Sequence, residues 1–241
     1  MWGLVAVAAV FQSIYYLGLA EAYRRGHLSV AYPLARSLPI LFVTAFNFLI
    51  GRGNQIGLLA MIGMALVIVG CLLLPMRRYS DLRISNYLHA SSLMALVAAT
   101  GTAGYSLADN EALRFLREAG LASIGKVHLA MLYLLLEMAG TAIVLLGYVL
   151  ISQRERLAWR ELRERGLLTA CIAGLLISTA YGLTLASMSF VSNVSYVVAF
   201  RQISIPLAAV LGVVLLKEPF AEPKLTGIFV LMVGLTMVAL G

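Results

Sequence analysis

Long apolar segments alternate with short polar connectors along the whole chain. About 20 consecutive apolar residues are enough to cross the roughly 30 Å hydrocarbon core of a bilayer as a helix. Eight segments reach or approach this length: 2–22, 28–50, 56–75, 88–109, 127–152, 167–191, 195–216 and 225–241. The pattern predicts an all-α integral membrane protein with eight transmembrane helices and no separate soluble domain. Continuous apolar runs of this length exclude a closed barrel of alternating strands.

Composition and charge agree with this prediction. The chain is 61% hydrophobic and 12% charged, whereas soluble domains have about 45–50% and about 25%. In a membrane protein the basic residues behind the net charge of +7 first indicate orientation, so we predict no nucleic-acid partner. Of the 18 basic residues, twelve lie in the odd-numbered connectors, four in the even-numbered ones and two inside spans. This excess predicts cytoplasmic odd-numbered connectors, both termini outside, and a bacterial-type inner membrane.

The most basic connector is QRERLAWRELRERG, residues 153–166. It combines five arginines and three glutamates with Leu157, Trp159 and Leu162. Basic helices with a few apolar side chains lie in the plane of the membrane interface. We therefore expect a charged helix at the cytoplasmic interface in preference to a specific lipid or protein site.

Signatures of catalysis and of metal binding are absent from the sequence. No HExxH, GxSxG, phosphate-binding glycine loop or CxxC pair occurs. The cysteines and histidines show no metal-ligand spacing: Cys71, Cys171, His27, His89 and His128. We predict no catalytic residue, no metal and no cofactor. Asp109, Glu111 and His128 are the loose candidates for the alternative of a membrane-embedded enzyme acting on lipid head groups.

An internal repeat relates the two halves of the chain. Shifting the sequence by 165 or 164 residues pairs four positions: Tyr16 with Tyr181, Arg36 with Arg201, Gly63 with Gly227, and Gly70 with Gly234. The first three predicted helices thereby match the last three. Each helix is five crossings away from its counterpart, so one repeat unit has five crossings. A unit with an odd number of crossings inserts its second copy upside down, as in inverted-repeat transporters. We expect a partial first repeat at 1–75, a cytoplasmic connector at 76–87 and a second repeat at 88–241.

Two segments resemble the EamA-like family of the drug/metabolite transporter superfamily. They are LAEAYRRGHLSVAYPLARSLPILFV and VSYVVAFRQISIPLAAVLGVVLLKEPFAEPKLTGIFVLMVGLTMVAL. The resemblance implies two inverted five-helix repeats and solute transport, but it names no solute. It also implies two helices before Met1, resembling 88–109 and 127–152; the other possibility is an eight-helix form that closes its cavity as a homodimer. Family members have cytoplasmic termini, yet we follow the charge count, because a short loop with five arginines is costly to export.

Arg36 and Arg201 are the most informative polar residues inside the predicted spans. A central arginine costs on the order of 2.5–3.5 kcal/mol by insertion scales, so it should face protein or water. Glu137 is the only carboxylate deep inside a span, and two arginines against one carboxylate leave a surplus positive charge for an anion to neutralise. The other predicted substrate-binding residues are polar: Tyr32, Asn47, Tyr105, Tyr181, Gln202 and Ser204. Glu137 is the candidate for proton coupling.

Structural roles compete with these functional ones. The arginines could instead pair with Glu137 or with carbonyls freed by Pro33, Pro39 and Pro206. Scattered polar side chains usually join membrane helices by hydrogen bonds, and glycines recurring every seven residues let helices approach closely. Polar residues also share faces of two spans: Gln12 with Tyr15, and Thr102 with Tyr105 and Asp109.

The predicted function is secondary transport of a small organic metabolite by alternating access between the repeats. The solute would carry a carboxylate, phosphate or phosphonate group, and its partners are the solute and the lipid bilayer. No ATP-binding motif is present, so we predict a non-enzymatic protein driven by an ion or proton gradient or by exchange. A truncated, non-transporting membrane component is a further alternative.

Overall fold

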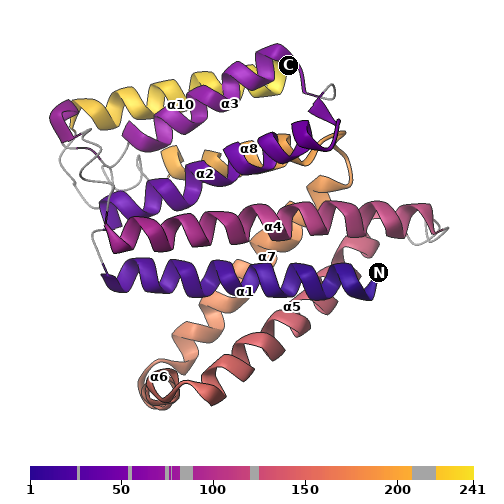
Figure 1. Cartoon of the computed structure of the whole chain (residues 1–241), viewed down its shortest axis with the longest axis vertical. Coiled ribbons are helices and arrows are strands. Elements are labelled where there is room, and N and C mark those ends of the chain that lie inside the picture. The colour runs from indigo at the N-terminus through magenta and orange to yellow at the C-terminus, as the bar shows by residue number, and fades with distance from the viewer. Residues whose placement is uncertain are drawn as a thin grey trace. The chain divides into compact units, whose positions relative to one another are not determined.

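The computed structural model of the chain describes residues 1–25, 28–53, 56–73, 76, 78–81, 89–119, 125–207 and 221–241, without the side chains of 28–34 and 165. All regular structure in these ranges is helical (Figure 1), which confirms the predicted all-α class. Contacts divide the chain into two units. Unit 1 comprises residues 1–13 and 108–190, and unit 2 comprises 14–107 and 191–241.

The helices follow the predicted spans closely. In chain order they are α1 (Trp2–Arg25), α2 (Leu28–Leu49), α3 (Leu58–Leu73), η2 (Tyr79–Asp81), α4 (Ala90–Glu118), α5 (Lys126–Ile151), α6 (Gln153–Arg165), α7 (Leu167–Met188), α8 (Val194–Phe200), η5 (Arg201–Ile203) and α10 (Glu222–Leu240). Four of them, α1, α5, α7 and α10, are long and apolar enough to span a membrane. The protein is thus a helical protein with membrane-length apolar helices.

The contact units do not follow the predicted repeats. Helices α1 and α4 each contribute residues to both units, and each unit contains segments from both halves of the chain. Contact units and sequence repeats are therefore different divisions of this molecule. The repeat boundaries stay a prediction, and within the connector 76–87 the structure describes only residues 76 and 78–81.

In unit 2, α3 and α10 lie side by side along their length (Figure 1). A Cβ atom on Gly63 would lie 2.6 Å from the Gly234 carbonyl oxygen, and one on Gly70 would lie 2.9 Å from that of Gly227. Real Cβ atoms essentially never come within 3.0 Å of such neighbours. The glycines therefore allow two backbones to touch, which confirms the close approach predicted from their seven-residue spacing.

Small residues also join α1 to α4 within unit 2. A Cβ atom on Gly18 would lie 2.8 Å from the backbone nitrogen of Ala98. One turn further along α1, the buried hydroxyl of Ser91 donates a 2.8 Å hydrogen bond to the carbonyl of Ala22. The two helices thus pack backbone to backbone, as helices do when small residues line their interface.

Helix α8 covers the first part of the predicted span 195–216. It begins at Val194, capped by the Asn193 side chain, which accepts a 2.9 Å hydrogen bond from the backbone nitrogen of Ser195. It changes to a 3-10 turn at Arg201–Ile203 and continues as helix to Leu207. Pro206 explains the change, because a proline offers no backbone N–H and its ring clashes with the carbonyl four residues earlier. The predicted residues beyond 207 lie outside the described ones.

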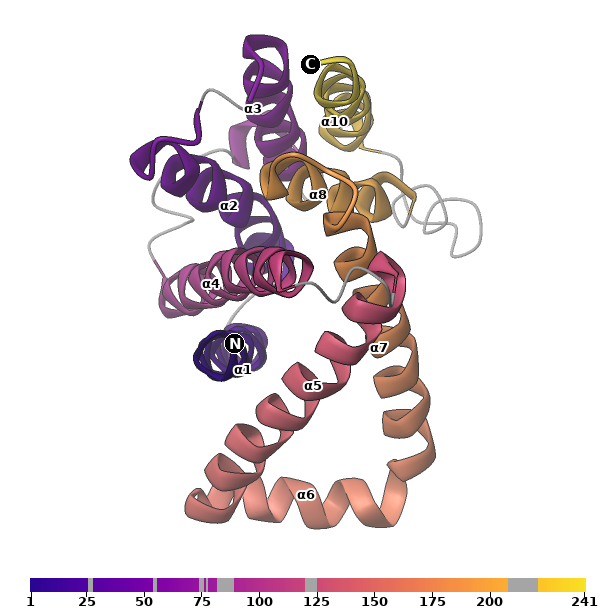
Figure 2. The ribbon, with the colours of Figure 1, turned by 90° about the vertical axis from the view of Figure 1, so that its right-hand side faces the viewer.

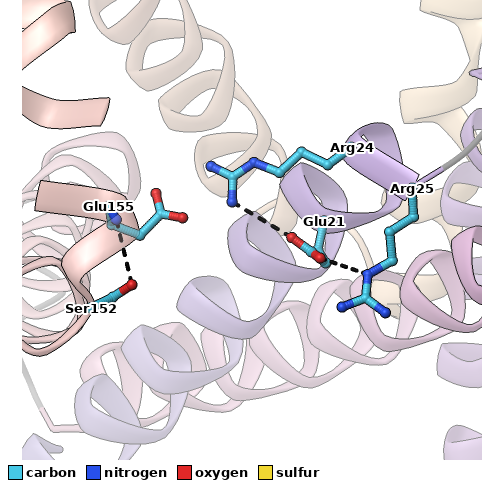
Figure 3. A network of polar contacts seen from close by, with 5 residues as sticks. All are labelled: Glu21, Arg24, Arg25, Ser152 and Glu155. Atoms are coloured by element: carbon cyan, nitrogen blue, oxygen red, sulfur yellow. Dashed lines mark hydrogen bonds and ion pairs between the residues drawn. The ribbon is translucent and has the colours of Figure 1, made fainter. Parts of the chain in front are cut away.

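In unit 1, α5, α6 and α7 form three sides of a triangle (Figure 2). Single residues, Ser152 and Gly166, separate α6 from its neighbours. The Ser152 side chain caps α6 by accepting a hydrogen bond from the backbone nitrogen of Glu155 (Figure 3), the arrangement favoured at helix N-termini. The charged connector predicted at 153–166 is thus a helix.

Candidate functional site

Unit 1 contains a cluster of buried acidic and phenolic side chains. Asp109 on α4 and Glu137 on α5 are both 0% exposed; Tyr181 of α7 bonds to both of them, and Tyr133 of α5 bonds to Asp109. The Tyr133 hydroxyl donates a 2.8 Å hydrogen bond to Asp109 Oδ1. The Tyr181 hydroxyl contacts both Asp109 Oδ2 and Glu137 Oε1, the latter at 3.2 Å. We call these four residues the carboxyl cluster.

The carboxyl cluster places one phenolic hydroxyl between two carboxyl groups. The Tyr181 hydroxyl carries one proton and faces two carboxyl groups, so it cannot donate to both at once. If Tyr181 donates to Asp109, its oxygen can accept a hydrogen bond from a protonated Glu137. Two ionised carboxylates buried together are costly. The arrangement therefore has a place for one exchangeable proton.

Neighbouring contacts hold α5 in position around the carboxyl cluster. One turn after Glu137, the hydroxyl of Thr141 donates a 2.7 Å hydrogen bond to Gln12 Oε1 on α1, and both residues are buried. A Cβ atom on Gly140 would lie 3.0 Å from the Cβ of Ala9. The first half of α1 and the middle of α5 are thus closely packed within unit 1.

Unit 2 contains a group of arginines and tyrosines. Both terminal nitrogens of Arg201 donate 3.2 Å hydrogen bonds to the Tyr105 hydroxyl. The guanidinium carbon also lies 5.9 Å from the centre of the Tyr105 ring, a distance at which a cation and an aromatic ring attract each other. Tyr15 packs edge-on against Tyr105, with the ring centres 5.9 Å apart. Arg36 and Arg201 both act electrostatically on Tyr15.

We call Arg36, Arg201, Tyr15 and Tyr105 the arginine group. Tyr105 is 1% exposed, while both arginines are only partly buried. A guanidinium presents five donors in a planar fork that suits carboxylates and phosphates. The arginine group can therefore bind an oxyanion while its tyrosines supply the apolar surroundings.

The other predicted site residues differ in burial and in their hydrogen-bond partners. Asn47 is buried and donates hydrogen bonds to the carbonyl of Val43 and, at 3.2 Å, to the Ser195 hydroxyl, so it joins α2 to α8. Gln202 is buried and its Nε2 donates to the Val198 carbonyl. Ser204 is exposed and donates to the Arg201 carbonyl. Tyr32 lies in α2, and its side chain is outside the described ones.

Sequence reasoning placed Tyr181 with the arginines through the repeat, whereas in the structure it bonds to the carboxyl cluster of unit 1. It also missed Tyr133, although Tyr133 stands four residues before Glu137 and thus on the same face of α5. Asp109 was noted only as a face position of its span and as a loose enzyme candidate. In the structure it is fully buried between two tyrosines.

Across the described residues, no group of three or more His, Cys, Asp or Glu side chains could hold a metal ion. The described cysteines are free thiols, Cys71 buried and Cys171 exposed. Among the described residues, the carboxyl cluster and the arginine group are our two candidate sites. No family model, no curated protein and no solved structure matches the chain.

Proposed function

We propose that this protein is a multi-pass secondary transporter of the EamA-like type, which carries a small organic anion across a bacterial-type inner membrane. The observation that carries the proposal is the arginine group. Two arginines at repeat-related positions, Arg36 and Arg201, are partly buried in a unit built of apolar helices, and Arg201 donates two hydrogen bonds to Tyr105, which packs against Tyr15. Arginines are expensive among such helices and are placed there for function or for pairing. A solute with a carboxylate, phosphate or phosphonate group fits their charge and geometry.

Helix register supports a shared position for the two arginines. Asn47, near the end of α2, bonds to Ser195, at the start of α8, so the two helices run antiparallel. Arg36 lies eleven residues before Asn47, and Arg201 lies six residues after Ser195. At 1.5 Å per residue, the five-residue difference separates the two backbone positions by about 7 Å along the helices. Arg36 and Arg201 therefore lie at similar levels along their helices, which is compatible with binding of one anion by both.

Glycine contacts support an inverted repeat. The repeat shift exchanges Gly63 with Gly227 and Gly70 with Gly234. The observed close approaches are Gly63 to Gly234 and Gly70 to Gly227, and the exchange converts each into the other. A two-fold axis that relates the two repeats would produce such a pair of contacts, because it exchanges the repeat-related glycines. Because the two helices run antiparallel, that axis is perpendicular to them, as expected for inverted repeats.

The carboxyl cluster supports proton coupling in this proposal. Glu137 was the predicted proton carrier, and its hydrogen bond with Tyr181 and the proximity of Asp109 to the same hydroxyl provide a place for one exchangeable proton. Buried carboxyl groups in membrane proteins are typical of proton relays in transporters. The carboxyl cluster would then bind a proton on one side and release it on the other, and the movement of the proton down its gradient would drive the movement of the solute.

The test is uptake into proteoliposomes containing the purified protein. Three radiolabelled probes cover the proposed classes: lactate, glycerol 3-phosphate and phosphonoacetate, each measured with and without an inward proton gradient. A cationic probe, choline, serves as the control solute. We expect saturable uptake of at least one anion and none of choline. Uptake equal to that of protein-free liposomes for all three anions, in protein that is folded by its melting curve, would reject transport of these classes.

A further inference from the structure

Helix α6 lies where a membrane surface is expected. It connects α5 and α7, which are both long and apolar enough to span a membrane, through single residues at either end. Figure 2 shows it running across the ends of these two helices. At 1.5 Å per residue, its 13 residues cover about 20 Å. If α5 and α7 span the membrane, a helix so short and so closely attached to both lies along the interface.

The side chains of α6 suit an interface and do not suit solution. Leu157, Trp159 and Leu162 are 65%, 53% and 39% exposed. Nothing in the described chain covers these three apolar side chains to the degree expected of a soluble helix. Tryptophan is enriched at the headgroup level of bilayers because its ring is apolar and its N–H is polar. These side chains therefore suit contact with a bilayer surface.

A stripe of arginines runs along one face of α6. Arg156, Arg160 and Arg163 stand at spacings of four and three residues, which places them on one side of the helix. Trp159 neighbours the stripe, three residues after Arg156 and four before Arg163. All three arginines are exposed. We call Arg156, Arg160 and Arg163 the arginine stripe.

Three arginines outside α6 form salt bridges, whereas the arginines of the stripe form none with the residues that the structure describes. Arg24 and Arg25 bind Glu21 (Figure 3), and Arg114 binds Glu111 and Glu118. None of the three stripe arginines forms a salt bridge with another residue that the structure describes. Their charges are thus available to an external anion beside Trp159.

We propose that the arginine stripe is a binding surface for anionic phospholipid head groups and that it enriches these lipids around α6. Guanidinium groups pair well with phosphates. Each basic residue near an anionic bilayer strengthens association about fivefold, as the energy per charge implies. The surface selects among lipids of its own membrane, and the proposal does not depend on whether the protein transports a solute.

The test uses Trp159 as the reporter in the full-length protein. The chain has two tryptophans, so a Trp2→Phe background leaves one emitter. The protein is reconstituted in phosphatidylcholine vesicles containing phosphatidylglycerol, with bromine atoms on the acyl chains of one lipid or the other. Quenching of Trp159 then gives the association constant of phosphatidylglycerol relative to phosphatidylcholine. We expect a ratio of at least about five at low salt, falling towards one at about 1 M salt.

Two variants separate the arginine stripe from bulk charge. Replacing its three arginines by glutamine (R156Q, R160Q and R163Q) should bring the ratio to about one. The matched variant R160E, E161R, R163E and E164R keeps composition and net charge but moves two arginines off the face of Trp159, and it should lose most of the preference. Equal preference in this matched variant would overturn the proposal, because total charge would then suffice.

Three results with the unaltered arginine stripe would also overturn the proposal, so it does not depend on the variants folding. Equal quenching by both brominated lipids would mean no headgroup selection. Weak quenching by either would place α6 away from the bilayer and favour a protein partner. Loss of the preference on adding millimolar glycerol 3-phosphate, at constant ionic strength, would identify a soluble phosphate as the ligand.

Discussion

The two units accommodate polar side chains among apolar helices in different ways. In unit 1, Asp109 and Glu137 are 0% exposed and are hydrogen-bonded by tyrosines of their own unit. In unit 2, Arg36 and Arg201 are partly exposed. The same unit contains the close glycine contacts between α3 and α10. A fully buried carboxyl cluster can hold and release a proton, because a proton is small enough to pass between hydrogen-bonded groups. A partly open arginine group can exchange a larger anion.

The largest expected effect is on solute recognition in unit 2. Replacing Arg36 or Arg201 by glutamine should lower anion uptake at least about tenfold, both under a proton gradient and in solute exchange, because a charge that meets the anion is lost. Lysine should restore only part of the uptake, since it lacks the planar fork. Uptake in proteoliposomes, beside the melting temperature in detergent, measures both outcomes.

The control for this prediction is Arg114→Gln, which removes an arginine paired with Glu111 and Glu118 at the surface of α4. It should leave uptake nearly unchanged. If the arginines are instead structural partners of Glu137, the Arg36→Gln and Arg201→Gln proteins should be heat-labile. Adding Glu137→Gln should then restore their stability.

The second prediction separates unit 1 from unit 2. Glu137→Gln and Asp109→Asn keep the shape of the carboxyl cluster but remove an exchangeable proton. They should lower proton-driven accumulation about tenfold while leaving solute exchange close to normal, because exchange requires no net proton movement. Accumulation ratios and exchange rates are measured in the same proteoliposomes. Loss of both activities, with an unchanged melting temperature, would show that the acids bind solute and would remove the contrast between the units.

The third prediction concerns the glycine contacts of unit 2. Gly234→Ala should cost about 1–3 kcal/mol, because its Cβ would lie 2.7 Å from the Gly63 carbonyl oxygen, and backbone cannot move aside as a side chain can. The melting temperature should fall by roughly 2–10 °C. Gly174→Ala in α7 is the matched control. Nothing lies within 4 Å of the Cβ that it adds, so alanine should be neutral or slightly stabilising there.

The smallest expected effect is at the hydrogen bond between α2 and α8. Asn47→Leu removes the bond to Ser195, and interhelical hydrogen bonds in membranes contribute about 0.6 kcal/mol on average. The melting temperature should fall by roughly 1–3 °C. If Asn47 only joins helices, the concentration of anion giving half-maximal uptake should not change. A large increase in that concentration would assign Asn47 to the solute site.

Periodic features of this fold could be predicted from sequence, and pairings between distant residues could not. Apolar length predicted the helices, and the seven-residue glycine spacing predicted a close helix–helix approach, which the structure places between α3 and α10. The apolar span 88–109 did not predict that α4 continues to Glu118, where Arg114 pairs along the helix with Glu111 and Glu118. Four of the described helices are long and apolar enough to span a membrane, so eight spans stay a prediction.

The polar contacts show why the sites were harder to predict than the helices. Asp109 and Tyr181 are 72 residues apart, and Tyr105 and Arg201 are 96 apart. No local pattern encodes such pairs, because packing between helices determines them. The repeat singled out Arg36 and Arg201 as a pair, but it gave no information about the aromatic neighbours of Arg201 or about the hydrogen bonds of Tyr181.

A double-mutant cycle on anion affinity tests most directly whether Arg36 and Arg201 meet one anion. The affinity of the transported probe is measured in the unmodified protein, in Arg36→Gln, in Arg201→Gln and in the protein with both changes. If both arginines bind the same anion, the losses should be non-additive by roughly 0.5–3 kcal/mol, because the second removal acts on a contact already weakened. Additive losses, or no loss in either single variant, would contradict the account.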